Sequence, residues 1–250
     1  MKKNVDKDLQ FTFLNREKLF ANQNLRLWYE FLYKEIIADS EKKVPLKILE
    51  IGSGSSPFKT YNEDIITTDI LNLPFLDIIF DAHEIHEQEQ IQNESLDMII
   101  LTNVMHHLKD PTEFLENAIV KLKANGRVIF TEPYFSVFSN IIYTYIHKED
   151  VDKKIDEPKL ANIEGPLSSA NIFIPHKIFF ERKDWLVKIE KNYSIDELKF
   201  FTSISYFATG GMTYHFKLPF FKFFFKLDNL IAKLFPKLFA SFFICTLRKK

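Results

Sequence analysis

The feature that most constrains this chain is a glycine turn that directly follows a short apolar run. The run is Ile48–Ile51, and the turn after it reads Gly-Ser-Gly-Ser-Ser-Pro over residues 52–57. A short apolar run bounded by turn residues is typical of a buried strand. Ser56 is a favourable helix N-cap, and Pro57 suits the first turn of a helix. The sequence therefore predicts a strand, a tight turn and a helix, with backbone that a ligand can approach because glycine has no Cβ.

The residues of this turn limit which nucleotide it can hold. A dinucleotide fingerprint needs Gly-x-Gly-x-x-Gly, and Pro57 stands at its third glycine position. The sequence has no Gly-Lys-Ser/Thr, which excludes a P-loop. Glu50, Gly52 and Gly54 instead match an acidic-x-Gly-x-Gly pattern, and in this the chain resembles the class I S-adenosylmethionine-dependent methyltransferases. The third glycine of that family's motif falls on Ser56, which is small and can cap a helix.

Two further acidic residues extend the resemblance. Ile65–Asp69 reads as a β-rich strand, and a carboxylate at the end of a second strand can accept both hydroxyls of a ribose. Ile78–Phe80 precedes Asp81 and Ala82, where the family has an acid and a small residue that contact adenine. The resemblance implies S-adenosylmethionine as cofactor, held by Glu50, Gly52, Ser53, Gly54, Asp69, Ile70, Asp81, Ala82 and Asn103.

Three titratable residues are candidates for a base that removes the proton of an acceptor hydroxyl. His106 follows the fourth predicted strand, Glu132 follows the fifth, and His147 lies in the segment beyond it. Histidine titrates near neutral pH, so His106 and His147 rank ahead of Glu132 as catalytic residues. The neighbouring His107 matches a recurrent histidine of the family and is expected to pack or to form hydrogen bonds.

A polar segment after the third predicted strand resembles a metal site only superficially. His83, His86 and Glu87 lie close together in sequence, but they do not form a His-Glu-x-x-His pattern. The segment is charged and polar all round, which is typical of a solvated loop or helix face. The sequence therefore predicts no metal site.

Strand and helix patterns alternate through the first half of the chain, which predicts an α/β fold with a parallel, doubly wound sheet. A helix is expected from Asp110 to Leu122, ending at Asn125-Gly126, and another over Phe179–Trp185. Val187–Lys191 is the predicted sixth strand, and Phe242–Leu247 the last. The resemblance implies a mostly parallel, seven-stranded, Rossmann-like methyltransferase sheet whose last strand is antiparallel beside the fifth and sixth.

The 250 residues are enough for one α/β domain, within which four parts are expected. These are an N-terminal helical cap (1–46), a cofactor-binding core (47–135), an insertion that covers the substrate (136–180), and C-terminal strands with an amphipathic helix (181–250). The cap has one stripe of Leu9, Phe13, Leu14 and Phe20, and a clearer one of Leu25, Trp28, Tyr29, Leu32, Tyr33 and Ile36. Loops are expected over Lys42–Pro45 and around Gly210–Met212.

Composition limits the partners and the cellular compartment that are expected for the protein. The 33 basic and 34 acidic residues give a net charge of −1, which is no electrostatic footprint for nucleic acid. One cysteine excludes an internal disulfide framework and fits a reducing compartment. The basic Met1–Lys3 is not followed by a signal-length apolar stretch, and no run approaches the ~20 apolar residues of a membrane span. The sequence predicts a cytoplasmic protein.

An amphipathic helix is expected within residues 216–239. Lys222, Lys226 and Lys233 lie on one side at helical pitch. The opposite side carries Phe223, Leu227, Leu230, Ile231 and Leu234. Two interpretations stay open: the apolar side packs on the core, or the helix contacts the inner membrane surface or a lipid-linked acceptor peripherally.

These patterns together predict methyl transfer from S-adenosylmethionine to a small-molecule acceptor, such as a sugar or a lipid-linked glycan precursor. The ring of Tyr134 could favour the cationic cofactor. Two other functions stay open. One is a non-catalytic protein that binds S-adenosylmethionine or another nucleotide, and the other is an NAD-dependent oxidoreductase, which Pro57 disfavours.

Overall fold

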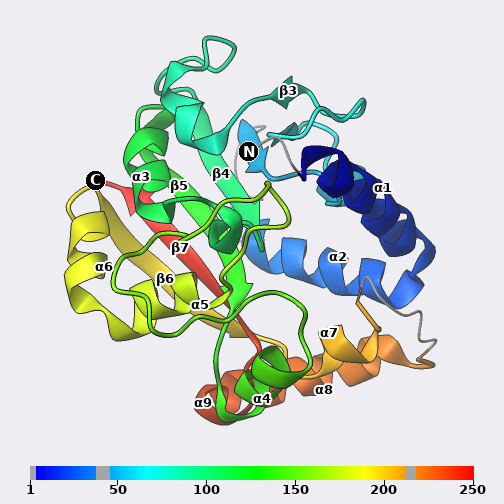
Figure 1. The fold of residues 1–250 in the computed structure, drawn as a ribbon. Helices are drawn as coiled ribbons and strands as arrows, with labels where there is room; N and C mark the ends of the chain where they lie inside the picture. Colours follow the sequence, from blue (N-terminus) through cyan, green and yellow to red (C-terminus); the bar gives the residue numbers. More distant parts are fainter. Residues whose placement is uncertain (1–3, 38–45, 212–217) are drawn as a thin grey trace.

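The computed structural model describes residues 4–37, 46–211 and 218–250. Met1–Lys3, the predicted loop Lys42–Pro45, Met212 and residues 216–217 of the predicted amphipathic helix lie outside the described residues. Figure 1 shows a central sheet with helices packed against it, and α4, α8 and α9 gathered at one end of the molecule.

Within the described residues, seven strands form one sheet in the order β3-β2-β1-β4-β5-β7-β6. The first five strands are parallel to one another, and β7 runs antiparallel between β5 and β6. The predicted doubly wound, mostly parallel sheet with an antiparallel last strand is therefore confirmed. The strands are β1 (Ile48–Ile51), β2 (Ile66–Asp69), β3 (Ile78–Ile79), β4 (Leu96–Thr102), β5 (Leu122–Pro133), β6 (Tyr193–Phe201) and β7 (Phe242–Lys249).

Helices cover both faces of the sheet, which explains why its central strands are mostly apolar. Leu49 and Ile99 face a core formed with α3, α5 and α6, whereas Ile48 and Ile100 face a second core formed with α2 and α8. The helices are α1 (Val5–Ala21), α2 (Gln23–Ile37), α3 (Pro111–Ala118), α4 (Val137–Tyr145), α5 (Phe173–His176), α6 (Lys183–Glu190), α7 (Ser205–Ala208), α8 (Phe221–Leu234) and α9 (Pro236–Phe239). Short 3₁₀ turns are η1 (Phe58–Thr60), η2 (Ala82–Glu87) and η3 (Met105–His107), and η4 (Lys177–Glu181) is a π turn.

The two N-terminal helices are confirmed, but they pack differently. Every member of the predicted α2 stripe is buried. The predicted α1 stripe is wrong for Phe13 and Leu14, which are exposed, although Phe20 packs against the core. The buried side chains of α1 are Asp8, Thr12 and Leu19. The reason is that α1 lies over polar loops instead of the sheet, and the N–H of Leu167 donates to Asp8 Oδ2 at 3.0 Å.

The predicted helix after the glycine turn is a single 3₁₀ turn, η1. Ser56 Oγ does accept the N–H of Phe58 at 3.1 Å, as an N-cap would. Phe58 is buried and stacks on Tyr33 with ring centroids 3.9 Å apart. The polar run at residues 61–64 that follows has no apolar periodicity to extend a helix, so the predicted helix is limited to this one short turn.

Two other boundaries differ from the prediction in the first half of the chain. Asp110 caps α3 through the N–H groups of Thr112 and Glu113, as expected, but α3 ends at Ala118. Leu122 already pairs with Leu96 in the sheet. Residues 125–126 therefore lie within β5, where Asn125 adopts φ 62° and accommodates the register shift between the paired residues.

The predicted sixth strand at Val187–Lys191 is wrong. Residues 183–190 form α6, whose buried Trp185 and Ile189 are spaced by four, while Val187 is exposed. This is a helical period, although the short β-branched run resembles a strand. The sixth strand is instead β6, and the predicted helix over Phe179–Trp185 is divided between η4 and α6.

The amphipathic helix forms as α8 and α9, but the predicted apolar side of α8 does not pack on the core. Phe221, Phe225 and Ala232 are buried, whereas Phe223, Leu227, Leu230 and Leu234 on the predicted apolar side are exposed. Among the described residues, no helix has both the length and the apolar character that crossing a membrane requires.

Candidate active site

The glycine turn fits closely between β1, β2 and the segment after β4. Gly52 has φ +73°, and a Cβ there would lie 2.5 Å from Val104 Cγ2. Ser53 is buried, and its N–H donates to the carbonyl of Thr68 at 2.8 Å. A side chain at Gly52 would therefore be strained by the left-handed backbone and would also clash with Val104.

Glu50 is the penultimate residue of β1 and lies inside the protein, with 1% of its surface exposed. Ser56 Oγ donates to Glu50 Oε1 at 2.6 Å. In the described part of the chain, the other oxygen, Oε2, has no hydrogen-bond partner. Burial raises the pKa of Glu50 to about 7, although the hydrogen bond from Ser56 opposes the shift. This carboxyl group thus has one oxygen free for a ligand that donates hydrogen bonds or carries positive charge.

Asp69 ends β2 beside the turn, as predicted. The N–H of Gly54 donates to its Oδ2 at 3.0 Å, and the N–H of Leu71 donates to its Oδ1 at 2.9 Å. Burial raises the pKa of Asp69, and its backbone hydrogen bonds oppose that shift. Ile70 is half-buried next to it.

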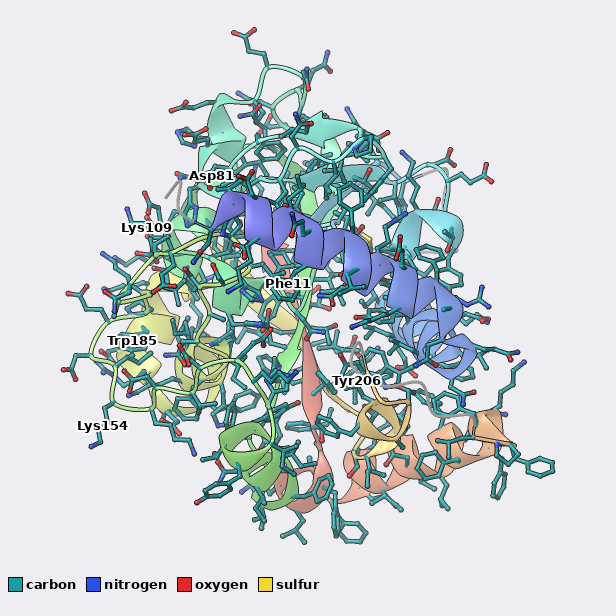
Figure 2. All side chains as sticks on the ribbon, turned by 45° about the vertical axis from the view of Figure 1, so that its right-hand side comes forward. Phe11, Asp81, Lys109, Lys154, Trp185 and Tyr206 are labelled. Carbon is teal, nitrogen blue, oxygen red and sulfur yellow. The ribbon has the colours of Figure 1, made fainter. Side chains whose placement is uncertain are left out.

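Asp81 and Ala82 lie at the carboxyl end of β3, the strand that pairs with β2. Asp81 Oδ1 accepts from the N–H of His83 at 3.0 Å and lies 2.8 Å from its Nδ1. His83 Nε2 in turn accepts the N–H of Asp110 at 3.2 Å, which assigns the proton to Nδ1. The hydrogen bond from His83 lowers the pKa of Asp81. The hydrogen-bond partner of Asp81, which Figure 2 labels, therefore lies in its own turn and not in the glycine turn.

Asn103 follows β4 in a left-handed conformation, with φ 56°. Its N–H donates to the carbonyl of Thr131 at 2.8 Å. Over the residues described, its Oδ1 is buried without a partner. The next residue, Val104, packs against Gly52, so the amide oxygen of Asn103 and the free oxygen of Glu50 belong to neighbouring segments.

A histidine and two carboxylates lie immediately beyond Val104. The N–H groups of Val104 and Met105 donate to Glu132 Oε1 at 3.0 and 2.7 Å, and Glu132 Oε2 lies 2.5 Å from His106 Nδ1. On the other side, His106 Nε2 lies 3.4 Å from Glu149 Oε2. Glu132 and the His106 ring are both buried, while about a third of the Glu149 side chain is exposed (34%). Glu132, His106 and Glu149, which we call the array, thus extend from the interior to the surface.

The electrostatics of this array are strongly coupled. Burial alone would lower the pKa of His106, but the carboxylates of Glu132 and Glu149 outweigh it and raise that pKa to about 10. Burial would raise the pKa of Glu149, yet His106 and the histidines at 107 and 147 hold it well below its usual range. A proton placed on His106 Nε2 is therefore strongly stabilised.

The other two histidines of the cluster have different partners. His107 Nδ1 lies 2.9 Å from the carbonyl of Ser169, and its Nε2 lies 3.7 Å from Glu149 Oε1. His147 Nδ1 accepts the N–H of Glu149 at 3.3 Å, and burial lowers the pKa of His147. Glu149 joins all three histidines but was not among the predicted site residues, because only the fold brings residues 106 and 149 together.

Helix α1 lies directly over the glycine turn, and Figure 2 shows it in front of the strands. Arg16 donates to the carbonyl of Ser56 at 2.8 Å, and a Cβ on Gly54 would lie 2.8 Å from Thr12 Cγ2. Burial lowers the pKa of Arg16, while the carboxylate of Glu50 opposes the shift. The N-terminal cap therefore closes the turn from outside.

Tyr134, which was expected to face the cofactor, belongs to a different cluster. It is buried beside His176, Phe180 and Phe200, with ring centroids 4.8 to 5.1 Å away. A contact of Tyr134 with the glycine turn is not seen among the described residues.

The site fits S-adenosylmethionine chemically. Glu50 Oε2 and Asn103 Oδ1 are acceptors left over at the turn, in the part of the chain the structure describes. A cofactor with an ammonium and a sulfonium group satisfies such acceptors, because buried polar atoms are otherwise costly to leave unpaired. Gly52 keeps the backbone accessible where a side chain has no room.

The strand order, the antiparallel last strand and the glycine turn at the end of β1 together define the Rossmann-like methyltransferase fold. The chain belongs to the family described as a methyltransferase domain, whose profile matches residues 19–165, more than half of its length. It is an S-adenosylmethionine-dependent methyltransferase, and S-adenosylmethionine is its cofactor.

The chain is similar to several solved structures. The PH0226 protein from Pyrococcus horikoshii OT3 is 13% identical with a TM-score of 0.51, over 91% of this chain and 92% of that one. A SAM-dependent methyltransferase from Archaeoglobus fulgidus is 18% identical with a TM-score of 0.48, over 88% and 93%. The N-methyltransferase NodS from Bradyrhizobium japonicum WM9, in complex with S-adenosyl-l-homocysteine, is 11% identical with a TM-score of 0.48, over 99% of each chain. Among curated proteins, none matches this sequence.

Proposed function

We propose that this enzyme methylates a hydroxyl group of a small-molecule acceptor, a sugar or a lipid-linked glycan precursor. The observation that carries this proposal is the position of His106. Its Nδ1 is held by Glu132 at 2.5 Å, and its Nε2 faces Glu149 next to the segment that packs on Gly52. A histidine anchored in this way suits an acceptor whose proton must leave.

The cofactor side of the site is assigned to the predicted residues at the carboxyl ends of β1, β2, β3 and β4. Glu50 and Asn103 offer their free oxygens, Asp69 offers its carboxylate to the ribose, and the glycine turn provides close backbone. Asp81 and Ala82 are assigned to adenine, and for this Asp81 must share its carboxylate with His83. Bound here, the cofactor supplies a methyl group on a sulfonium, which needs positioning and a dry site.

On the acceptor side, His106 removes the proton at Nε2 in its neutral form; because the two carboxylates raise its pKa to about 10, turnover should increase as pH rises toward that value. The buried carboxylate of Glu132 orients the ring through Nδ1 and stabilises the imidazolium that forms. His147 is the second candidate base, since burial lowers its pKa and keeps it neutral. The insertion at residues 136–180 brings both His147 and Glu149 over the site, and the N–H of Asn171 donates to the carbonyl of His106 at 3.0 Å. The insertion thus acts as a cover for the acceptor.

A lipid-linked acceptor is favoured by an apolar surface next to this cover, which we call the apolar end. Lys222, Lys226 and Lys237 flank it, and Figure 1 shows its three helices, α4, α8 and α9, together. A large exposed apolar patch with basic neighbours is typical of contact with an anionic membrane surface. Its exposed side chains are Val137, Ile141, Tyr145, Ile146, Phe220, Phe223, Leu227, Leu230, Leu234, Phe235, Leu238 and Phe239.

The apolar end is connected to the array through α4. Tyr143 of α4 is buried, and its ring lies 5.7 Å from that of His147 in an edge-to-face arrangement. His147 is two residues from Glu149, which faces His106. An acceptor whose lipid stays in the membrane would therefore present its polar head to the array at the end of α4.

The test is to incubate the purified chain with S-adenosylmethionine and two acceptor sets, and to measure release of S-adenosylhomocysteine. One set contains soluble sugars, and the other contains lipid-linked glycan precursors in anionic vesicles. We expect turnover with the second set, and retention of cofactor binding but loss of turnover in His106→Ala. A parallel incubation uses amine and thiol acceptors, and turnover with these alone would overturn the hydroxyl assignment. Cofactor binding without turnover on either set would favour a non-catalytic binding protein.

A further inference from the structure

Three side chains of the types that bind transition metals meet at the surface end of the array. The ligand atoms of His106, His107 and Glu149 all lie within 4.8 Å of one another. Two of the separations are 3.4 Å, from His106 Nε2 to Glu149 Oε2, and 3.7 Å, from His107 Nε2 to Glu149 Oε1. Ligands bound at about 2.1 Å to one tetrahedral cation lie roughly 3.4 Å apart. The geometry points to a site for a divalent transition-metal cation of the Zn²⁺ type on these three residues.

Both histidines are oriented as metal ligands usually are. Each ring has its Nδ1 fixed by an oxygen, which is the Glu132 carboxylate at 2.5 Å for His106 and the Ser169 carbonyl at 2.9 Å for His107. With the Nδ1 proton donated in this way, the Nε2 lone pair of each ring points toward Glu149. Such outer partners fix the tautomer and raise the basicity of a ligating imidazole.

An unsatisfied polar atom gives an independent reason for a ligand. His106 is buried, with 2% of its surface exposed, and within the described residues its Nε2 has no hydrogen-bond partner. Glu149 Oε2 lies 3.4 Å from it, which is an ion-pair distance. A cation between the two would satisfy Nε2 and would also balance the carboxylates of Glu132 and Glu149.

The donor set selects the kind of cation. Two imidazole nitrogens and one carboxylate suit Zn²⁺, Co²⁺, Ni²⁺ or Fe²⁺, whereas Mg²⁺ and Ca²⁺ prefer sites made of oxygen. Three protein ligands leave at least one position open, as in catalytic zinc sites. About a third of the Glu149 side chain is exposed (34%), so a cation can enter from solvent. His147 is not assigned as a ligand, because its Nδ1 accepts the N–H of Glu149.

The sequence alone predicted no metal site, since residues 106 and 149 are far apart in the chain and form no metal-binding pattern. The assignment of the cation does not depend on the proposed reaction. Its role does rest on the proposed function: a cation here would bind the acceptor oxygen at its open position and lower the pKa of that hydroxyl. In the loaded enzyme the cation takes the Nε2 lone pair, so His106 acts as a ligand and the acceptor proton goes to His147, whose pKa burial lowers, or to water.

The experiment uses the full-length chain without an affinity tag, stripped with a chelator and titrated with Co²⁺ in the absence of S-adenosylmethionine. Visible absorption reports the coordination geometry, and elemental analysis after dialysis gives the stoichiometry. We expect one Co²⁺ per chain, with the intense visible band of a four-coordinate ion, lost on adding Zn²⁺ but not Mg²⁺. Because cofactor and acceptor are absent, a failure of the proposed reaction leaves this result unaffected.

Two ligand variants and one matched control decide the assignment. Glu149→Gln and His107→Gln should each weaken Co²⁺ binding by about tenfold or more, and the partly exposed Glu149 can be replaced with little risk to folding. The control is His86→Gln, which removes an exposed histidine 3.4 Å from the Glu87 carboxylate, outside the cluster. No Co²⁺ binding at millimolar concentration, or equal losses in Glu149→Gln and His86→Gln, would overturn the site.

Discussion

The backbone N–H of Gly54 donates to the carboxylate of Asp69 at 3.0 Å, which joins the ends of β1 and β2 directly. In the sequence the two residues belong to different motifs: Gly54 to the glycine turn, and Asp69 to the second strand, where it is the terminal acid. In the folded chain they form a single unit, in which the glycine turn is held in place by the same side chain that is assigned to the ribose.

Asp69→Ala should weaken S-adenosylmethionine binding by ~1.5–3 kcal/mol, because the carboxylate is lost both to the cofactor and to Gly54. This corresponds to a dissociation constant roughly 10- to 150-fold higher, measured by isothermal titration calorimetry. Asp64→Ala is the control, since Asp64 is exposed before β2. An unchanged dissociation constant for Asp69→Ala would make this residue an ordinary strand end.

Gly52→Ala should reduce both stability and cofactor binding. The left-handed backbone at Gly52 costs about 1–2 kcal/mol for a residue with a side chain, and the new Cβ would meet Val104 at 2.5 Å. Urea unfolding of Gly52→Ala, Val104→Ala and the double variant separates the two effects. The cost of Gly52→Ala should be smaller when Val104 is already Ala. If the losses of unfolding free energy in the two single variants add up to the loss in the double variant, the clash with Val104 contributes nothing.

The raised pKa of Glu50 predicts how the free energy of unfolding depends on pH. Its folded pKa of about 7 lies above the ordinary value of 4.5, so between these values the folded state holds a proton that the unfolded state has lost. The free energy of unfolding should therefore fall as pH rises from about 4.5 to 7, by an amount on the order of 3 kcal/mol, and this contribution is absent above pH 7.

Glu50→Gln keeps the shape of the side chain but cannot ionise, so it should lack this part of the pH dependence and be more stable than the native chain at pH 8. Denaturant unfolding at a series of pH values measures both effects. Glu63→Gln, which changes an exposed residue, should follow the native profile. If the Glu50→Gln profile has the native slope, Glu50 is ionised in the folded protein throughout.

Replacing His106 should separate chemistry from cofactor binding. Once an acceptor is known, His106→Ala should lower the turnover number by ~10²–10⁴ with the cofactor dissociation constant retained. His147→Ala provides the comparison between the two candidate bases. Full activity in both variants would mean that the acceptor proton leaves to water or that the acceptor needs no base.

The apolar end should bind anionic vesicles. Lys222→Glu, Lys226→Glu and Lys237→Glu combined should release the protein in a sedimentation assay, because anionic lipids attract these exposed lysines. Lys233 is left in place, since it pairs with Glu35 of α2 at 3.2 Å.

The apolar contribution is tested separately by Phe223→Ser, at a side chain that is 73% exposed and can be changed with little effect on the fold. Val187→Ser changes an exposed apolar residue of α6 and is the matched control. Native protein that never sediments with such vesicles would contradict membrane contact.

Local patterns predicted the sheet well, because each parallel strand is an apolar run that ends at a turn or an acid, and such signals are short-range. The strand predicted around Val187 was wrong because a β-branched residue on an exposed helix face has the same local pattern as one in a strand. The face of α8 could not be assigned either, because amphipathic spacing identifies an apolar side but not what that side contacts. Glu149 was missed for a third reason: its partners are distant in sequence, and only the insertion brings them together.

The position of α1 has a consequence for the kinetics of the enzyme. Arg16 fixes the helix to Ser56 beside the glycine turn, and Asp8 accepts from the N–H groups of Leu167 and Ser168 at 3.0 and 3.2 Å. The same helix thus contacts both the glycine turn and the insertion, and we predict that spent cofactor leaves only after α1 detaches from both. If so, Arg16→Ala should shorten the residence time of bound S-adenosylhomocysteine, measured by stopped-flow displacement, and an unchanged dissociation rate would contradict this role of α1.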